Sequence, residues 1–330
     1  MRIHLWPVAM SAFLMLSLPA CSREDPAAPA LKKWSFQFST DAVAVKGAPE
    51  HELSRSVGMS ACVFDDGAQP GLPEYMWNGE VVRKGAGWDT ADSYARPAAG
   101  KSIVFQAYYP FFPQDGTAPV RLAAPSVPGP LTLEYEVPAD VSDQVDLMTG
   151  ESEVLSTDGD LEDVSVAMRH RLSAIQFVTG DIGLAGTIKS ISLKDIHGKG
   201  SYRHGDDGWT LPDQTDGACF TVRPGFVVEG VTLAGDPDGR KMVAGGDDTF
   251  LMLPQAIPDG AKMVIEYEAA VDGVTSVHVL EARLRSRSIP EWQMGKVYTY
   301  QISVVSLALE YEAFVNDWEM GGQTDVHITF

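Results

Sequence analysis

The sequence predicts an all-β protein built as two tandem antiparallel β-sandwich domains. Apolar and polar residues alternate with a period of two in many short segments, whereas helical periodicity is scarce. Clusters of Gly, Pro and Asp separate these segments, in a chain of 330 residues that contains 31 Gly and 21 Pro. Many short strands joined by such turns are typical of sandwich folds.

We expect a strand wherever this alternation is sustained. Asp272 and Gly273 separate two alternating runs, which is a strong signal for a hairpin. A polar, acidic stretch at 149–163 has no apolar pattern, so we place a domain boundary there, with an N-terminal domain at 34–160 and a C-terminal domain at 161–330. The expected strands, in chain order, are 34–39, 59–64, 103–109, 131–137, 164–168, 174–179, 188–193, 226–233, 249–253, 262–270, 277–285, 298–307 and 325–330.

The first 21 residues predict a lipoprotein signal peptide. Arg2 gives a basic start, an apolar run extends from Leu5 to Leu18, and small residues precede Cys21. The run of about 14 residues is shorter than the ~20 that span a bilayer as a helix. A lipoprotein signal peptidase requires a Cys at this point, so we expect the mature chain to begin at a lipidated Cys21, outside the cytoplasm. The alternative is a plain secretory signal with an incidental Cys, which the scarcity of cysteine disfavours.

Residues 22–33 are polar and rich in Pro and Ala, and we interpret them as a flexible tether. The net charge of −20 argues against nucleic-acid binding, because no basic stripe is available to contact phosphates. Cys62 and Cys219 each lie in a strand-like apolar run, which favours two buried thiols over a disulfide. The cysteine spacing fits no metal site, and we expect neither a metal nor a cofactor. Alternation places Arg283, Arg285 and Arg287 on one face of a strand, where a solvated edge or face is expected.

Six segments, taken in order, carry a family resemblance. They are the apolar strand ending in Ala-Tyr-Tyr-Pro at 103–110, Gln-Val-Asp-Leu-Met at 144–148, the run 164–177 that contains His170, Leu-Pro-Gln at 253–255, the run 292–300, and Val-Asn-Asp-Trp at 315–318. In this order they resemble the fimbrillin family, specifically the Mfa-like fimbrillins of Bacteroidales. Met168 departs from the pattern, because an aromatic residue is common there, and Arg169 precedes the His.

The resemblance implies a pilin of type V fimbriae. Such a protein has two transthyretin-like sandwiches, is exported as a lipoprotein to the outer membrane, and is assembled on the cell surface, where it contributes to adhesion. In that family an arginine-specific protease removes the N-terminal strand, and the groove left behind takes a strand from another fimbrial subunit. Glu24 and Asp25 resemble the signal that sends lipoproteins of Bacteroidetes to the outer face of the outer membrane.

The sequence offers counterparts for both halves of strand exchange. Arg55 lies in a polar stretch after the first expected strand, where proteolysis is tolerated, so the bond between Arg55 and Ser56 is the candidate maturation site, unless Arg55 is an ordinary loop residue. The last seven residues alternate to the end of the chain, which puts Val326, Ile328 and Phe330 on one face of a candidate donor strand. An ordinary last strand of the second sandwich is the other interpretation, and both can hold at different stages.

We find no constellation that predicts an enzyme. His170 lacks a nucleophile motif and is interpreted as a packed, hydrogen-bonded residue. Tyr75, Trp77 and Trp88 lie in a stretch rich in Gly, Pro and Asp, where they form either a sugar-binding platform or a cover over the mouth of a sandwich. The sequence therefore predicts a structural fimbrial subunit, and the alternative is a monomeric surface lipoprotein that binds glycans.

Overall fold

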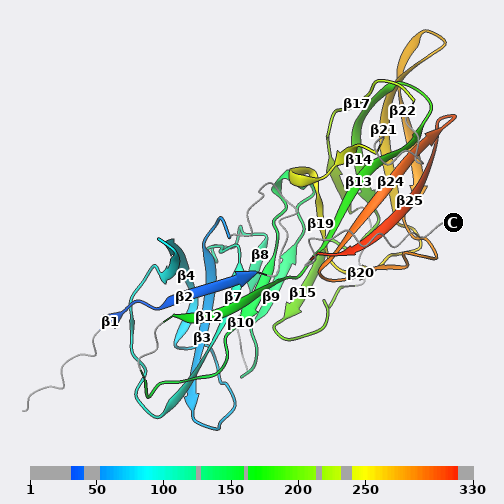
Figure 1. Ribbon diagram of the computed structural model, residues 1–330. Coiled ribbons are helices and arrows are strands. Elements are labelled where there is room, and N and C mark those ends of the chain that lie inside the picture. Colours follow the sequence, from blue (N-terminus) through cyan, green and yellow to red (C-terminus); the bar gives the residue numbers. More distant parts are fainter. Residues whose placement is uncertain are drawn as a thin grey trace, which may run out of the picture.

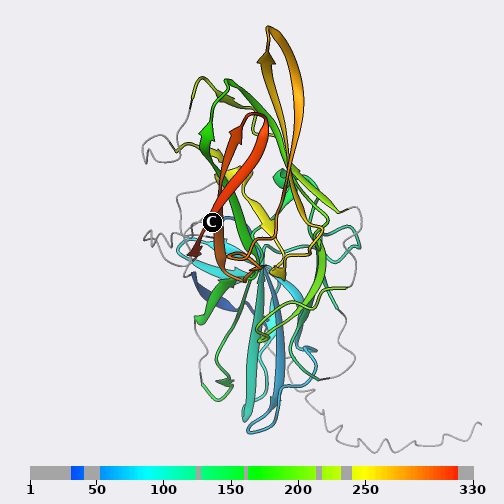
Figure 2. The same cartoon turned by 90° about the vertical axis from the view of Figure 1, so that its right-hand side faces the viewer.

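The computed structural model describes residues 31–40, 53–123, 128–159, 163–212, 218–231 and 240–318. Figures 1 and 2 show an elongated molecule with two groups of strands, one toward each end. Two 3-10 turns, η1 (Val141–Asp143) and η2 (Gly246–Asp248), are the only helical elements among these residues. The expected all-β class is confirmed, while the transthyretin-like form of each unit stays a prediction.

The first group of strands forms a sheet that closes on itself. The strand order is β10-β12-β2-β5-β4-β3-β7, and β10 also pairs with β7, so no strand of this ring is an edge. The closed sheet surrounds a core that includes Met59, Phe105 and Val166. The strands are β2 (Ser35–Thr40), β3 (Val57–Asp65), β4 (Met76–Lys84), β5 (Gly87–Thr90), β7 (Lys101–Tyr109), β10 (Met148–Glu151) and β12 (Val164–His170), with β11 (Leu155–Ser156) added beside β7 and a separate pair of β1 (Leu31–Lys32) and β6 (Tyr94–Ala95).

The second group forms two five-stranded sheets that share one core. In the first of these sheets β13 runs parallel to β24, which pairs antiparallel with β25. In the second, β14 pairs with β21, which pairs with β22. The strands are β13 (Ser173–Ile182), β18 (Met242–Ala244), β19 (Phe250–Met252), β24 (Lys296–Val305) and β25 (Ala308–Asp317) in one sheet, and β14 (Gly186–Lys194), β16 (Cys219–Val222), β17 (Phe226–Val228), β21 (Lys262–Val271) and β22 (Val274–Arg283) in the other. A short pair, β20 (Gln255–Ala256) and β23 (Glu291–Trp292), accompanies them.

A three-stranded sheet ties the two halves of the chain together. It has the order β15-β9-β8, where β8 (Val120–Leu122) and β9 (Thr132–Glu136) precede residue 160 and β15 (Lys199–Arg203) follows it. Side chains of this sheet, such as Leu133 and Tyr202, belong to the second core. A cut at residue 160 would also separate β12 from the closed sheet that it completes. The two cores therefore interleave along the chain.

The expected strands between residues 34 and 307 each have a counterpart, and the hairpin at Asp272 and Gly273 is confirmed. These two residues have φ values of 52° and 79° and connect β21 to β22. The strands that were not expected include β4, β5, β10, β15 and the ten-residue β25. In β4, Asn78 has a φ of 48° and Gly79 interrupts the alternation, so a bulge hides the strand from a period-two search. The expected strand at 325–330 lies outside the described residues.

A buried histidine connects the three-stranded sheet to the closed sheet. The ring Nε2 of His204 lies 3.2 Å from the carbonyl oxygen of Ala107 in β7, while the His204 backbone N–H donates to Leu131. Burial lowers the pKa of His204 to about 4, and the positive charge of Arg171 contributes to the shift. The ring is therefore neutral in the folded protein at neutral pH.

We expect His204 to make the protein acid-sensitive. Its pKa is about 4 when folded and 6.5 in the unfolded reference, so the unfolded chain binds a proton first as the pH falls. The stabilisation is complete above pH 6.5 and is lost toward pH 4, with a slope of about 1.4 kcal/mol per pH unit. In His204→Gln the free energy of unfolding, measured by urea titration across this range, should fall less steeply than in the wild type. Parallel curves would contradict the expectation.

Gly58 permits a close crossing of β3 by Tyr108. A Cβ at this position would lie 2.0 Å from the Tyr108 ring, whose hydroxyl donates to the Asn78 side chain at 2.7 Å. Gly58→Ala should lower the free energy of unfolding by about 1–3 kcal/mol, the usual cost of overpacking, because the ring is held at its far end. Gly208→Ala is the matched control, since nothing lies within 4 Å of its Cβ. Equal urea midpoints for the two variants would show that Tyr108 moves aside freely.

Candidate maturation site and removable strand

Arg55 lies directly before β3, and residues 41–52 between it and β2 are not described. Its side chain is exposed, and the guanidinium carbon lies 5.4 Å from the centre of the Phe112 ring. Arg55 and Phe112 line an open groove of about 720 Å³ that also contains Glu136 and Asp143. The structure thus places Arg55 on the surface, as the sequence predicts. Cleavage at this residue stays a prediction.

The residues on both sides of Arg55 are hydrogen-bonded to the rest of the fold. The carbonyl of Ser56 accepts a hydrogen bond from the N–H of Phe111 at 2.8 Å, and the Ser54 hydroxyl lies 3.3 Å from the Tyr109 hydroxyl. Leu53 is only 7% exposed. A protease that needs an extended substrate would have to detach this segment from Phe111 and Tyr109 before it could cut.

Strand β2 is the element that a cut after Arg55 would disconnect. It pairs in parallel with β12 over five residues, from Phe36 opposite Val164 to Thr40 opposite Met168. On its other side it makes two antiparallel pairs with β5. Six residues thus bridge two strands that would otherwise be edges of the sheet.

Alternate side chains of this segment fill the first core. Trp34 and Phe36 are buried, and their rings lie 4.9 and 5.2 Å from the ring of Phe105. Phe38 is half-buried, and its ring lies 5.6 Å from that of Trp88. The sequence showed the alternation of these residues, but not that they sit beside β12, because parallel pairing between distant segments leaves no local signal.

The candidate donor strand, with Val326, Ile328 and Phe330, lies outside the described residues, as does the lipidation candidate Cys21. The last described residue, Trp318, stacks on His170 with ring centroids 3.9 Å apart. His170 is also hydrogen-bonded through Nδ1 to Asp146 at 2.8 Å and is buried at the end of β12. The structure confirms the packed role predicted for His170, and it places the start of the C-terminal segment beside the strand that holds β2.

The three aromatic residues proposed as a sugar platform do not form one. Trp88 is in β5, is 8% exposed and packs in the first core, because its short strand faces Phe38 across the sheet. The hydroxyl of Tyr75 accepts from Trp34 and donates to the carbonyl of Ala95, both at 2.8 Å. Trp77 alone of the three is largely exposed, at 40%.

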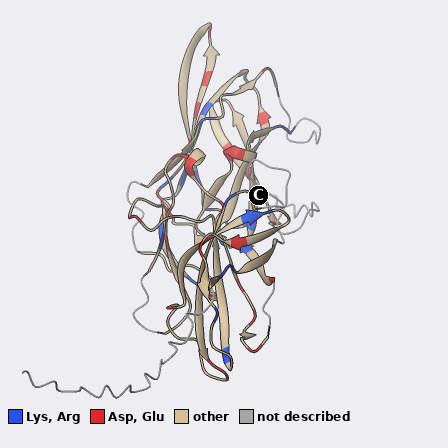
Figure 3. Cartoon of the chain, turned by 90° about the vertical axis from the view of Figure 1, so that its left-hand side faces the viewer, with Lys and Arg blue, Asp and Glu red and all other residues tan. Residues whose placement is uncertain are grey.

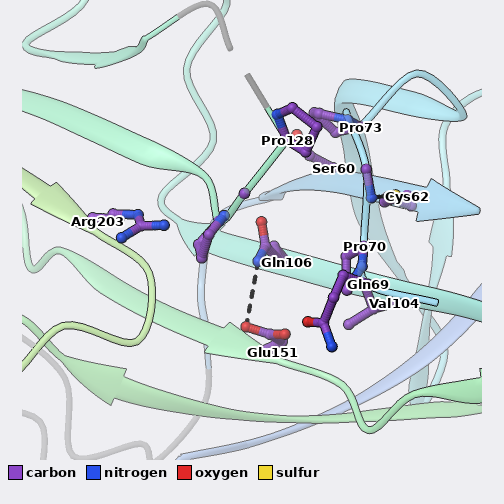
Figure 4. A pocket seen from close by; sticks show the side chains of 14 residues that line it. Ser60, Cys62, Gln69, Pro70, Pro73, Val104, Gln106, Pro128, Glu151 and Arg203 are labelled. Carbon is purple, nitrogen blue, oxygen red and sulfur yellow. Dashed lines mark hydrogen bonds between the residues drawn. The ribbon is translucent and has the colours of Figure 1, made fainter. Parts of the chain in front are cut away.

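A cavity of about 370 Å³ lies on the outer face of β3 and β7 (Figure 4). Gln106 spans its floor, donating to Glu151 at 3.3 Å and accepting from the N–H of Leu131 at 2.9 Å. Burial raises the pKa of the Glu151 carboxyl, and the hydrogen bond from Gln106 opposes this shift. The Cys62 thiol accepts from the N–H of Gly71 at 3.0 Å at the edge of this cavity.

Charges and thiols offer no further chemical centre in the described part of the chain. Cys62 and Cys219 are free thiols, as expected, although Cys219 is only half-buried. Figure 3 shows Lys and Arg scattered among Asp and Glu rather than gathered in a stripe. Within the described ranges, no three His, Cys, Asp or Glu side chains converge as metal ligands. No helix there has the length and apolar character needed to span a membrane.

Comparisons with known proteins agree with this architecture. The model of the fimbrillin-like family matches residues 62–318. A fimbrial protein from Bacteroides vulgatus has 14% identity and a TM-score of 0.62, with 86% of this chain and 99% of that chain covered. A putative cell adhesion protein from Bacteroides ovatus has 14% identity and a TM-score of 0.56, with 88% and 98% covered. Among the curated proteins, none matches the chain.

These two structures share the fold with this chain, and the family match covers most of the first core, the second core and their junction. It begins within β3, after Arg55, and ends at Trp318. The segment before it contains β2, and the segment after it contains the candidate donor strand. On this evidence the chain belongs to the fimbrillin-like family.

Proposed function

We propose that this protein is a structural subunit of a cell-surface fimbria, anchored in the outer membrane through a lipid on Cys21 until it is assembled. An arginine-specific protease cuts after Arg55, β2 leaves, and the C-terminal strand of another subunit takes its place. The assembled fibre contributes to adhesion. Neither step requires catalysis by this chain.

The position of β2 is the observation that carries the proposal. It is an interior strand of a closed sheet, yet it joins the rest of the chain only through residues 41–55 on its C-terminal side. Its loss would leave β12 and β5 with unpaired backbone groups and would expose Phe105. Such an opening is suited to strand addition, in which main-chain hydrogen bonds give affinity and pockets select alternate side chains.

The candidate donor matches β2 in its pattern. Trp34, Phe36 and Phe38 are apolar residues spaced by two, and so are Val326, Ile328 and Phe330. A strand at 325–330 has the same six-residue length as β2. Burying three such side chains contributes roughly 1.5–3 kcal/mol each before ordering costs. The glycan-binding alternative has less support, because Trp88 and Tyr75 are engaged inside the fold.

The cleavage step can be tested with Arg55→Lys. This change keeps the positive charge over Phe112 but removes the residue that an arginine-specific protease recognises. We expect protein sheared from cells to start at Cys21 and to be monomeric in the variant, and to start at Ser56 in high-molecular-weight ladders in the wild type. Intact mass and N-terminal sequencing measure this. Arg121→Lys, a matched exposed arginine in the same groove, should behave as the wild type. Trimming at Ser56 in the Arg55→Lys variant would refute the assignment.

The donor step can be tested on the two faces of the last strand. Ile328→Asp puts a charge on the apolar face and should abolish the ladders, because burying an unpaired carboxylate costs several kcal/mol. Thr329→Asp, on the opposite face, is the control and should polymerise. A peptide of residues 323–330 should bind trimmed subunits and block growth, whereas the Ile328→Asp peptide should not. Equal polymerisation of both variants would rule out this strand as the donor.

A further inference from the structure

Strand β22 is an edge of its sheet that lacks several of the usual protections against pairing with another strand. Within the described residues it pairs only with β21, and the hairpin rises beyond the rest of the second core as the gold and orange arch in Figure 2. The pairing runs without a break from Val274 opposite Val271 to Arg283 opposite Lys262. Natural edge strands are commonly protected by Pro, Lys, bulges or short length. The ten residues of β22 contain no Pro, Lys or bulge.

The hairpin turn fixes which backbone groups of β22 face outward. In a two-residue hairpin the residues that flank the turn exchange both hydrogen bonds, and bonded and non-bonded pairs then alternate. Val271 and Val274 are the flanking pair here. The N–H and C=O groups directed away from β21 are therefore those of Thr275, Val277, Val279, Glu281 and Arg283. The carbonyl of Arg283 is already engaged, because it accepts a hydrogen bond from the Tyr311 hydroxyl at 2.8 Å.

The side chains along this edge are suited to strand pairing. Val277 and Val279 are 52% and 61% exposed and lie on the same face of the strand. Both are β-branched residues, which pack well across neighbouring strands. Asp272 lies in the turn at one end of β22, and Arg283 is its last residue at the other end.

We propose that the β22 edge pairs with the β22 edge of a second copy of this chain, antiparallel, about a two-fold axis at His278. In this register Val277 lies opposite Val279 of the second copy, and Thr275 lies opposite Glu281. All four outward-facing residues other than Arg283 then take part in each strand. A shift by one residue brings inward-facing groups to the seam. A shift by two either loses one of the four hydrogen-bonded pairs or places Thr275 opposite Arg283, whose carbonyl is taken by Tyr311.

Charge favours a second copy in this orientation. Gly273 lies opposite Arg283 of the second copy, which brings the acidic turn residue Asp272 beside that arginine at both ends of the seam. A parallel arrangement would instead place like charges together. The interface is isologous, so it closes on itself as a dimer. It is also separate from strand exchange, because β22 belongs to the second core and β2 to the first.

The register can be tested with single cysteines. Directly opposite residues of a non-hydrogen-bonded pair have Cα atoms about 4.5 Å apart, within the range that a disulfide bridges. His278→Cys, in mature chain carrying Cys21→Ser and Cys219→Ser, should give a disulfide-linked dimer on mild oxidation. Ser276→Cys is the matched exposed control and should not, because residue 276 lies opposite residue 280 of the second copy. Equal cross-linking of both, or of neither, would overturn this register.

The contact itself can be tested by sedimentation equilibrium. Wild-type protein should show a concentration-dependent dimer, while the double variant Val277→Lys, Val279→Lys should stay monomeric. Both side chains are exposed, so the fold is retained, and Val227→Lys on β17, with 60% exposure, should dimerise as the wild type does. A wild type that is monomeric at about 100 µM would exclude a dimer with a Kd below that concentration. Capture of a different protein through β22, with no self-association, would likewise overturn the proposal.

Discussion

The closed sheet of the first core depends on one strand of six residues. β2 completes the ring from its interior, with β12 on one side and β5 on the other, and its aromatic side chains fill the space that the ring encloses. Every other strand of the ring lies after residue 53 in the chain. The segment that closes the core is therefore also the one that the proposed cut after Arg55 would disconnect.

Contacts of Arg171 hold the junction between the two cores. Arg171, which follows β12 directly, donates from its backbone N–H to Leu147 and from Nε to Thr149, and its guanidinium lies 5.0 Å from the Tyr202 ring. The indole of Trp209 donates to its carbonyl at 2.7 Å. These contacts fix the junction on the side of β12 that faces away from β2.

Local alternation was enough to predict most of the long strands, because a half-buried strand must present one apolar face whatever its partner. The order of the strands was not predictable in the same way. The sequence shows that Phe36 and Val166 each lie in alternating runs, but their adjacency depends on parallel pairing across the chain. The polar stretch at 149–163 looked like a domain boundary because it lacks a pattern, whereas it connects strands of one closed sheet.

The candidate site was predictable in part for the same reason. Arg55 could be found from its isolation between Arg23 and Arg83, and its exposure followed from its polar neighbours. The contacts of Ser56 and Ser54 with Phe111 and Tyr109 could not be foreseen, because they depend on how the end of β7 folds back. Trp88 was wrongly interpreted as a loop residue. Its strand, β5, has only four residues and begins with a Gly, so its alternation is too short to recognise.

The stack of Trp318 on His170 has a mechanical consequence for a fibre. A pull on the C-terminal segment acts on Trp318 and then along β25, which is paired with β24 over ten residues. The ring stack and the Asp146 contact of His170 carry the same load directly into β12. In the fibre that we propose, tension in one subunit would thus reach β12, the strand against which a donor would be seated.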